Sequence, residues 1–323
     1  AQRVAGRSSA ERSGLMQPPL PLLTIAGSDS GGAAGLQADL KTWAALGAYG
    51  MSAITAVTAQ NSVAVRGVHF LPPEFVAAQI DAVLSDYGAA AIKTGFLGRV
   101  DIIEAVAERL AYWLGGGLEP RPALVVDPVL VNHRGESMFG PEVADAYRRL
   151  LFPLADLVTP NAAEAAVLGS GGAGEQGSRG AEEKRGGGAE EKWGGGAEEK
   201  RGGGAEEKRG GGAGERGSRG AEEKGRLGYV PASRLLLKGW RRDGGEVVDL
   251  YWDGEQTREL SQPRLDTINT HGSGDTLSAA ICAFRAQGHD WLEAVNMARA
   301  YTHAAIERGA AWRLGEGHGP LGH

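Results

Sequence analysis

Two kinds of hydrophobic pattern alternate along the chain. Short apolar runs rich in β-branched residues predict buried strands, and longer stretches whose apolar residues recur every three or four positions predict amphipathic helices. The expected strands cover residues 22–26, 52–58, 90–94, 123–127, a segment ending at Thr159, 234–238, 246–251 and 257–260. The expected helices cover residues 36–46, 74–84, 101–114, 141–151, 275–287 and 291–308. This alternation is typical of an α/β fold with a mostly parallel central sheet and helices on both faces.

One long segment, residues 169–228, interrupts the alternation. Within it the octapeptide Arg-Gly-Gly-Gly-Ala-Glu-Glu-Lys begins at Arg185, recurs with Trp193 in place of the arginine, and recurs again from Arg201. Three adjacent glycines disfavour a helix, and the other residues offer little apolar surface to offset the entropy of ordering. The sequence therefore predicts a flexible, low-complexity insertion.

The rest of the chain predicts a single domain, residues 19–323, interrupted by this insertion and preceded by a disordered tail at residues 1–18. Residues 1–15 are rich in Arg, Ser and Ala and contain one acidic residue, which also fits the remnant of an organellar targeting segment. We expect neither the tail nor the insertion to carry catalytic residues.

Composition and charge narrow the classes of function. The chain has 323 residues, of which 42% are hydrophobic, and this is enough to bury a sizeable core. A formal net charge of -6 gives no general attraction to nucleic acid or anionic membranes, and no stretch is apolar for long enough to span a bilayer. We therefore expect neither partner. The lone cysteine, Cys282, excludes an intrachain disulfide and suits a reducing, cytoplasmic location.

The strongest candidate for chemistry is the run Thr270-His-Gly-Ser-Gly-Asp-Thr276, directly before an expected helix. Glycines let the backbone turn its N–H groups inward, so the amides of Gly272, Ser273 and Gly274 predict an anion site suited to a phosphoryl group. Asp275 at the same turn can accept the proton of an attacking alcohol. The alternative interpretation is a flexible turn followed by an ordinary helix cap.

Three further groups follow expected strands. Asn161 and Glu164 form an Asn-x-x-Glu step whose oxygens suit Mg²⁺ held through water, and equally suit an N-cap with its capping-box partner. Asp127 ends a strand, where ligands collect in open α/β sheets, and we predict a secondary role toward Mg²⁺ and phosphate. Lys238 ends another strand, where its ammonium can reach a transferred phosphoryl group, although such lysines are common on surfaces.

Five long segments, residues 23–41, 54–61, 126–129, 157–161 and 267–276, stand in an order that resembles hydroxymethylpyrimidine/phosphomethylpyrimidine kinases of the ribokinase superfamily. The resemblance extends from about Leu22 to Pro320, without the insertion. It implies a ribokinase-like fold and ATP-dependent phosphorylation of 4-amino-5-hydroxymethyl-2-methylpyrimidine, and of its monophosphate, in thiamine biosynthesis. It also implies ATP as co-substrate, Mg²⁺ as cofactor and, in many members, a homodimer.

The resemblance assigns roles to individual residues. It places the pyrimidine against Gly27, Ala34, Asp39 and Gln60, with the Asp39 carboxylate hydrogen-bonded to the amino and nitrogen edge of the ring. The loop from Gly27 to Gly35 lacks a closing Gly-Lys-Ser/Thr, so it does not predict a P-loop nucleotide site.

On the nucleotide side, the resemblance implies that Asn161, Glu164 and Lys238 bind ATP, that Glu164 faces Mg²⁺ beside the Asp127 already assigned from its strand end, and that Asp275 is the base. Lys93 resembles a family lysine for which we expect a supporting role. Pocket shape is expected to differ from the family's, because Phe96, Trp240 and Arg241 replace other residues.

Asp275 is the departure with the clearest chemical consequence, because the family resembled most usually carries Cys there, whereas Asp is the base of the wider superfamily. A carboxylate can deprotonate an alcohol, but the second phosphorylation attacks with a phosphate oxygen that is already anionic. We therefore predict that phosphorylation of the alcohol is favoured over phosphorylation of the monophosphate.

Two other functions fit parts of the sequence. A pyridoxal or pyridoxine kinase shares the fold, the Mg-ATP chemistry and the glycine turn, while the substrate motifs favour a pyrimidine. A non-catalytic ligand-binding or scaffold protein would keep the fold and use the repeat for partners. The set of Asp275, Asn161, Glu164 and Lys238 favours an enzyme.

Overall fold

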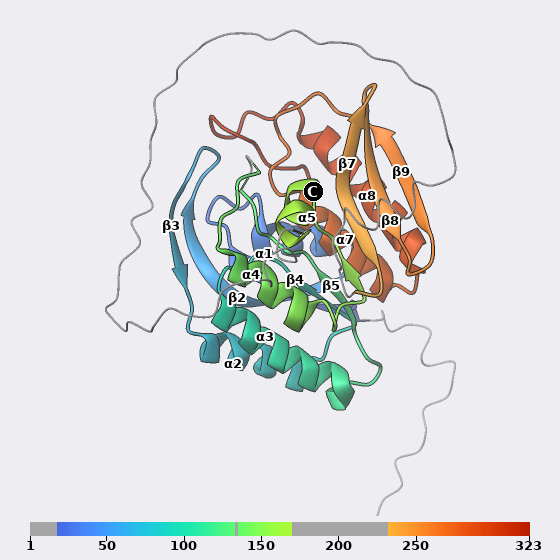
Figure 1. The fold of residues 1–323 in the computed structure, drawn as a ribbon. Helices are drawn as coiled ribbons and strands as arrows, with labels where there is room; N and C mark the ends of the chain where they lie inside the picture. Colours follow the sequence, from blue (N-terminus) through green and yellow to red (C-terminus); the bar gives the residue numbers. More distant parts are fainter. Residues whose placement is uncertain (1–17, 133–134, 170–231) are drawn as a thin grey trace, which may run out of the picture.

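The computed structural model describes residues 18–132, 135–169 and 232–323. Within these ranges a nine-stranded sheet in the order β3-β2-β1-β4-β5-β6-β7-β8-β9 forms the centre (Figure 1). The strands are β1 (Pro21–Ser28), β2 (Tyr49–Gln60), β3 (Val65–Phe70), β4 (Ala91–Thr94), β5 (Ala123–Val126), β6 (Leu157–Val158), β7 (Leu235–Asp243), β8 (Glu246–Trp252) and β9 (Thr257–Pro263). Apart from Pro18 and Gly169, the predicted tail at 1–18 and insertion at 169–228 lie outside the described residues.

The helices cover both faces of the sheet. They are α1 (Gly35–Ala45), α2 (Pro73–Asp86), α3 (Val100–Tyr112), α4 (Pro141–Ala146), α5 (Ala162–Gly169), α7 (Ser273–Ala286) and α8 (Trp291–Gly309). Helices α3 and α4 each continue in one wider turn, over Trp113–Gly117 and Tyr147–Leu151. Helices α2, α3 and α4 lie on one face, and α1, α7 and α8 lie on the other (Figure 1).

Six strands run parallel, and three antiparallel strands complete the two edges of the sheet. Strands β2, β1, β4, β5, β6 and β7 are parallel, whereas β3 pairs antiparallel with β2, and β8 and β9 follow β7 as antiparallel strands. The predicted α/β fold with a mostly parallel sheet and helices on both faces is confirmed. The edge strand β3 is an addition, because residues 65–70 were not among the expected strands.

Small side chains hold α7 close to the sheet. Ala279, Ala280 and Ala283 are buried on this helix, which packs against β4, β5 and α1. The buried indole of Trp43 on α1 donates to the carbonyl of Ala279 at 2.8 Å and joins the two helices. The start of α7 is thereby fixed above the carboxyl ends of the central strands, where ligands bind in open α/β sheets.

None of the helices in the described ranges combines the length and apolar character needed to cross a lipid bilayer.

Candidate active site

The glycine turn before α7 meets the loop after β1, although 240 residues separate Gly35 from Asp275 in the chain. Gly272 has a φ of +82°, and a Cβ atom there would lie 1.8 Å from the carbonyl oxygen of Ala33. The backbone amide of Gly35 donates to Oδ2 of Asp275 at 3.1 Å. The structure therefore brings together the two segments in which we predicted phosphate and substrate contacts.

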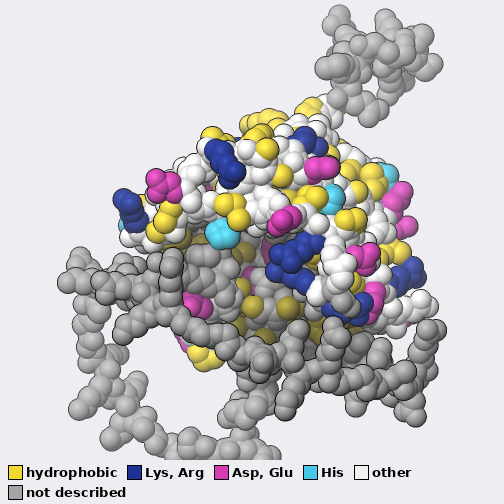
Figure 2. All heavy atoms as spheres, turned by 90° about the horizontal axis from the view of Figure 1, so that it is seen from above, with side chains coloured by type: hydrophobic (Ala, Val, Ile, Leu, Met, Phe, Trp, Pro, Cys, Tyr) yellow, Lys and Arg dark blue, Asp and Glu magenta, His cyan; other side chains and the backbone are white. Residues whose placement is uncertain are grey.

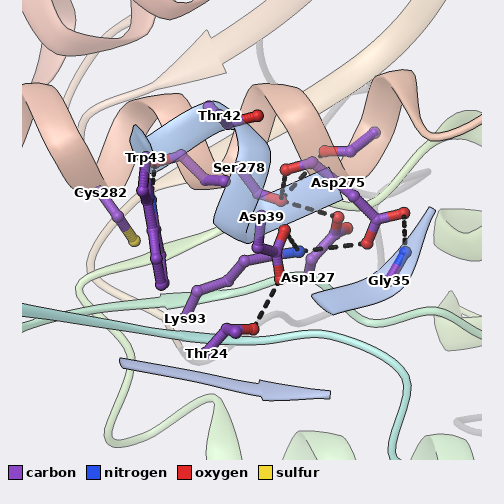
Figure 3. A network of polar contacts seen from close by, with 12 residues as sticks. Thr24, Gly35, Asp39, Thr42, Trp43, Lys93, Asp127, Asp275, Ser278 and Cys282 are labelled. Carbon is purple, nitrogen blue, oxygen red and sulfur yellow. Dashed lines mark hydrogen bonds and ion pairs between the residues drawn. The ribbon is translucent and has the colours of Figure 1, made fainter. Parts of the chain in front are cut away.

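Lys93 links Asp275 to the interior of the protein. Its Nζ lies 3.1 Å from Oδ1 of Asp275 and 2.6 Å from Oδ1 of Asp39, and Thr24 donates to Oδ2 of Asp39 at 2.6 Å (Figure 3). Thr24 and Lys93 are paired residues of the parallel strands β1 and β4, so their side chains emerge on the same face, below α1. Asp39 on α1 closes the network from above.

The surroundings of the two carboxylates move their pKa values in opposite directions. Burial alone would raise the pKa of Asp275, but the charge and hydrogen bond of Lys93, helped by the Gly35 amide and Lys238, lower it below the usual value. Burial raises the pKa of Asp39 to about 7, with a further contribution from the charge of Asp275, and Lys93 offsets this only in part. Two carboxylates thus share one ammonium, and Asp275 is the one that stays ionised.

The contact predicted between Asp39 and the pyrimidine ring stays a prediction, and the structure shows internal partners for this carboxylate instead. The Asp39 side chain is fully buried, and its two oxygens accept hydrogen bonds from Lys93 and Thr24. The carboxylate points from α1 toward the sheet. The side chain of Asp275 is 15% exposed and is the member of the network that reaches solvent.

A second charged group lies beside the turn. Lys238 Nζ donates to Oδ1 of Asp127 at 2.7 Å, and Ser278 on α7 donates to the other Asp127 oxygen at 3.1 Å. The ammonium lies 3.2 Å from where a Cβ atom of Gly274 would be, so it sits against the backbone of the turn. Burial opposes the charge of Lys238, but Asp127 and then Glu164 outweigh it and raise the pKa of the lysine. Lys238 therefore stays cationic next to the amides of the turn.

Only part of the predicted anion site has free amides. The backbone amide of Ser273 donates to the carbonyl of Thr270 at 3.1 Å, so this amide is already engaged. The described residues provide no acceptor for the amides of Gly272 and Gly274. An anion at the start of α7 would therefore meet these two amides and Lys238.

A bulge in β7 directs Lys238 toward Asp127. The register between β7 and β8 shifts between Leu237 and Arg241, and Gly239 in the bulge has a φ of +59°. The Gly239 amide donates to Oδ1 of Asp249 at 2.7 Å, and Arg299 on α8 donates to the other oxygen of the same carboxylate at 2.7 Å. The buried Asp249 and Arg299 were not predicted as site residues, because only the fold brings them behind the bulge.

Asn161 and Glu164 adopt the capping-box geometry that we considered as one of two interpretations. Oδ1 of Asn161 accepts from the Glu164 amide at 2.9 Å, and Oε2 of Glu164 accepts from the Asn161 amide at 2.8 Å. Asn161 also forms a parallel bridge with Lys238, which places the start of α5 beside the lysine. Burial, followed by repulsion from Asp127, raises the pKa of Glu164 to about 7 against the attraction of Lys238. A nearby cation would stabilise this carboxylate in its charged form.

Asp29 shapes the loop after β1 and was missed in the sequence. Its carboxylate accepts from the amides of Gly31, Ala33 and Ala34 at 2.8–2.9 Å. The signal that could have revealed it is local, because Asp followed by Ser-Gly-Gly is typical of a carboxylate that caps its own turn.

The other predicted substrate residues border this loop. Gly27 is buried, and a Cβ atom there would lie 2.9 Å from Phe96. Nε2 of Gln60 at the end of β2 lies 3.1 Å from Nε2 of His271 in the glycine turn. Gly27, Ala34 and Gln60 thus lie around the contact between the loop after β1 and the turn before α7.

The surface seen from above carries charges of both signs. Lys or Arg side chains lie close to Asp or Glu side chains there, rather than forming a patch of one sign (Figure 2).

The chain is similar to known proteins over most of its length. The chain matches the family described as phosphomethylpyrimidine kinase over residues 29–183 and 221–322. It is 39% identical over 302 residues to the hydroxymethylpyrimidine/phosphomethylpyrimidine kinase of Rhizobium meliloti, covering 93% of this chain and 96% of that protein. It spans about half the length of the bifunctional thiamine biosynthesis proteins of Geobacter sulfurreducens and Arabidopsis thaliana, 52% and 49% of their respective lengths.

Solved structures show the same fold. Bacillus subtilis pyridoxal kinase, crystallised as an ADP complex, aligns with a TM-score of 0.70 at 30% identity and covers 94% of this chain and 97% of that one. Phosphomethylpyrimidine kinase from Clostridium difficile 630 aligns with a TM-score of 0.62 at 32% identity, over 89% of this chain and 99% of that one.

The fold and the site together define a phosphotransferase of the ribokinase-like class. The chain belongs to the phosphomethylpyrimidine kinase family, and the resemblance described from its motifs is confirmed.

Proposed function

We propose that this chain transfers the γ-phosphoryl group of ATP to the hydroxymethyl group of 4-amino-5-hydroxymethyl-2-methylpyrimidine, and more slowly to the resulting monophosphate, in thiamine biosynthesis. The observation that carries the proposal is Asp275, an ionised and partly exposed carboxylate at the N-terminus of α7, next to the ammonium group of Lys238 across the turn. The names of the relatives supply the substrate class.

In the proposed reaction the hydroxyl oxygen of the acceptor attacks the γ-phosphorus. The bond between that phosphorus and the β–γ bridging oxygen breaks, and ADP leaves with the bonding electrons. Asp275 takes the hydroxyl proton, while the amides of Gly272 and Gly274 and the ammonium of Lys238 stabilise the charge on the moving phosphoryl group. The protein then supplies position and electrostatics rather than a covalent intermediate.

The residues around Asp127 fit the Mg²⁺ that accompanies ATP. Across the described ranges, no group of three or more His, Cys, Asp or Glu side chains is arranged to hold a metal ion. Mg²⁺ in kinases keeps several waters and is bound by one or two carboxylates together with phosphates, so a complete protein cage is not needed. Asp127 and Glu164 would hold the ion through water, and the raised pKa of Glu164 marks a carboxylate that a cation would stabilise. When bound, the ion neutralises charge on the phosphate oxygens.

A second candidate substrate class is pyridoxal or pyridoxine. The observation that favours it is the structural likeness, because the pyridoxal kinase of Bacillus subtilis aligns with a higher TM-score, 0.70, than the phosphomethylpyrimidine kinase of Clostridium difficile, 0.62. Both classes of acceptor carry a hydroxymethyl group on a six-membered nitrogen heterocycle, so the proposed proton transfer would be the same.

A coupled assay of ADP release tests both candidates. Hydroxymethylpyrimidine, pyridoxine and pyridoxal are offered in parallel to the full chain with Mg-ATP, and the largest kcat/KM is expected for the pyrimidine. Asp275→Asn is expected to lower kcat by about 10²–10⁴-fold. The matched control is Asp101→Asn, an exposed aspartate on α3, which should leave kcat unchanged. Acceptor binding without ADP release from any of the three would support the non-catalytic alternative and overturn the proposal.

A further inference from the structure

The Lys93 ammonium is enclosed between two carboxylates that differ in their access to solvent. The side chains of Lys93 and Asp39 are both 0% exposed, whereas the side chain of Asp275 is 15% exposed. All four residues of β4 are buried, so Lys93 reaches neither the surface nor a position in contact with an acceptor. Figure 3 shows the ammonium between the carboxylates of Asp39 and Asp275, with Thr24 below Asp39.

This arrangement contains one more carboxylate than a simple buried ion pair needs. A buried cation that loses its partner is strongly destabilised, so an isolated Lys93–Asp275 pair would oppose protonation of Asp275. Asp39 removes this conflict, because its carboxylate lies 2.6 Å from the Lys93 ammonium and can pair with it when Asp275 carries a proton. Asp275 can therefore gain and lose a proton while the ammonium remains paired.

We propose that Lys93, anchored by Asp39, is a positioning residue that fixes the direction of the Asp275 carboxylate and keeps it ionised until the acceptor hydroxyl delivers its proton. The inference rests on the proposed function and deepens it, because it assigns a role to two residues that touch neither substrate nor nucleotide in the proposed reaction. Thr24 completes the anchor by donating to the second oxygen of Asp39.

The other groups that face Asp275 come from α1 and β7. The Gly35 amide donates from α1, the charge of Lys238 attracts from β7, and Asp39 on α1 adds repulsion when it is ionised. The negative charge of Asp127 after β5 is paired with Lys238 and Ser278. These groups are unchanged when Lys93 alone is replaced, so the contribution of Lys93 can be separated from theirs.

The proposal predicts different effects for the two members of the anchor. Without the Lys93 cation, Lys93→Met leaves two buried carboxylates facing each other, so the pKa of Asp275 rises. Asp39→Asn resembles the protonated form that the raised pKa of Asp39 favours, so Lys93 still holds the pKa of Asp275 below its usual value in this variant. A purely structural ion pair would give two variants with the same defect.

The test is the pH dependence of kcat/KM for the acceptor, measured from about pH 4 to about pH 9 at saturating Mg-ATP. The pKa of Asp275 lies below its usual value, so the wild-type acidic limb is expected at or below the lower end of this range. Lys93→Met is expected to move the limb up by at least about one pH unit, whereas Asp39→Asn is expected to leave it low. The double variant Lys93→Met/Asp39→Asn removes one charge of each sign and should lie between them. A limb that stays low in Lys93→Met, or that moves up equally in Asp39→Asn, overturns the proposal.

A second readout does not require turnover. Carbon-13 NMR of the aspartate carboxyl groups, with Asp275 assigned from its absence in Asp275→Asn, follows proton binding directly in the folded protein, and thermal unfolding checks the fold of each variant. A wild-type chain that transfers phosphate to no acceptor would refute the proposed function, and the NMR titration would still decide whether Lys93→Met raises the pKa of Asp275 while Asp39→Asn does not. If Lys93→Met does not fold, the charge-balanced double variant and Asp39→Asn carry the same test.

Discussion

A Cβ atom at Gly272 would lie 1.8 Å from the carbonyl oxygen of Ala33, so the turn before α7 and the loop after β1 are in direct backbone contact. The φ of +82° at Gly272 belongs to the left-handed region, which side chains other than glycine rarely adopt. Asp275 lies three residues further on and accepts from the Gly35 amide at the end of the same loop. One glycine thus sets the distance between the proposed base and the loop predicted to border the acceptor.

Gly272→Ala is therefore expected to be costly for both stability and activity. Backbone strain contributes about 1–3 kcal/mol and the forced separation of the two segments a similar amount, so we expect a loss of at least about 2 kcal/mol in the free energy of unfolding. The matched control is Gly288→Ala, where φ is +97° but a Cβ atom would meet open space. Chemical denaturation should show a larger loss for Gly272→Ala, accompanied by a fall in kcat of about tenfold or more. Equal losses would mean that the contact with Ala33 is unimportant.

The buried ion pair between Asp249 and Arg299 is expected to act on Lys238 through the bulge in β7. Asp249→Ala removes the acceptor of the Gly239 amide and leaves Arg299, which is 6% exposed, without its carboxylate. Breaking a buried pair in this way costs about 3–5 kcal/mol of stability. Because the bulge presents Lys238 to Asp127, we also expect kcat to fall by about tenfold or more while the KM of the acceptor changes little.

Two controls separate these effects. The double variant Asp249→Ala/Arg299→Met leaves no unpaired charge and should recover much of the stability but not the activity, because the Gly239 amide still lacks its acceptor. Glu259→Ala breaks the exposed pair between Glu259 on β9 and Arg241 on β7, which reaches across β8, and should cost about 0–1 kcal/mol. Activity that returns together with stability in the double variant would show that Asp249 acts on the fold alone.

The raised pKa of Asp39 predicts how the stability of the protein depends on pH. Its pKa is about 7 in the folded protein and 3.8 in the unfolded reference, so the folded state holds the additional proton between these values. The stability contributed by this proton is fully present below about pH 4 and is lost as the pH rises through about 7. Asp39→Asn mimics the protonated form, and the melting temperature of the variant relative to the wild type should increase by about 2 °C or more from about pH 5 to about pH 8. Asp101→Asn on the surface serves as the control, and a constant difference for Asp39→Asn would contradict the prediction.

The hydrophobic pattern of the sequence was sufficient to predict the strands and helices that are mostly buried. The apolar run predicted at 123–127 is β5, observed at Ala123–Val126, and the helix predicted at 275–287 is α7, observed at Ser273–Ala286. The edge strand β3 has no such run, because its residues are half-buried or exposed and its conformation depends on pairing with β2. The strand that was missed is therefore one whose conformation depends on pairing with a neighbouring strand rather than on its own burial.

The same distinction applies to the site. Asp275, Lys238 and the Asn161–Glu164 step lie in motifs, and the structure places all of them around the start of α7. The partner of Asp39 was not predictable, because it depends on the register of β1 against β4 and on the docking of α1 above them. A carboxylate inside a substrate motif was therefore interpreted as a ligand contact, whereas its contacts are internal.

The octapeptide repeat is predicted to be dispensable for catalysis. Residues 184–220 lie between the two ranges that match the family. The repeats at 185–208 belong to this unmatched segment. Deletion of residues 185–208 removes three whole octapeptides and is expected to change kcat and KM by less than about twofold, because closing a shorter loop alters the entropy only slightly. Steady-state kinetics and thermal unfolding of the deletion variant check this. A substitution of the same segment by a Gly-Ser linker of equal length is the control for loop length, and a tenfold loss in both variants would assign the repeat a role in the reaction.

Asp275 is expected to set the balance between the two phosphorylation steps. The first step needs a base for a neutral hydroxyl, whereas in the second the attacking phosphate oxygen is already anionic and is repelled by the ionised Asp275 carboxylate. Asp275→Cys replaces the carboxylate with a thiol, whose usual pKa of about 8.5 makes it less fully ionised than a carboxylate near pH 7. We expect this variant to lose rate in the first step by about 10²-fold and to gain or keep rate in the second, as measured by product analysis with the alcohol and the monophosphate as separate acceptors. Asp275→Ser is the control for side-chain size without an ionisable group. If the second step has the same rate in the wild type, Asp275→Cys and Asp275→Ser, charge at this position does not select between the acceptors.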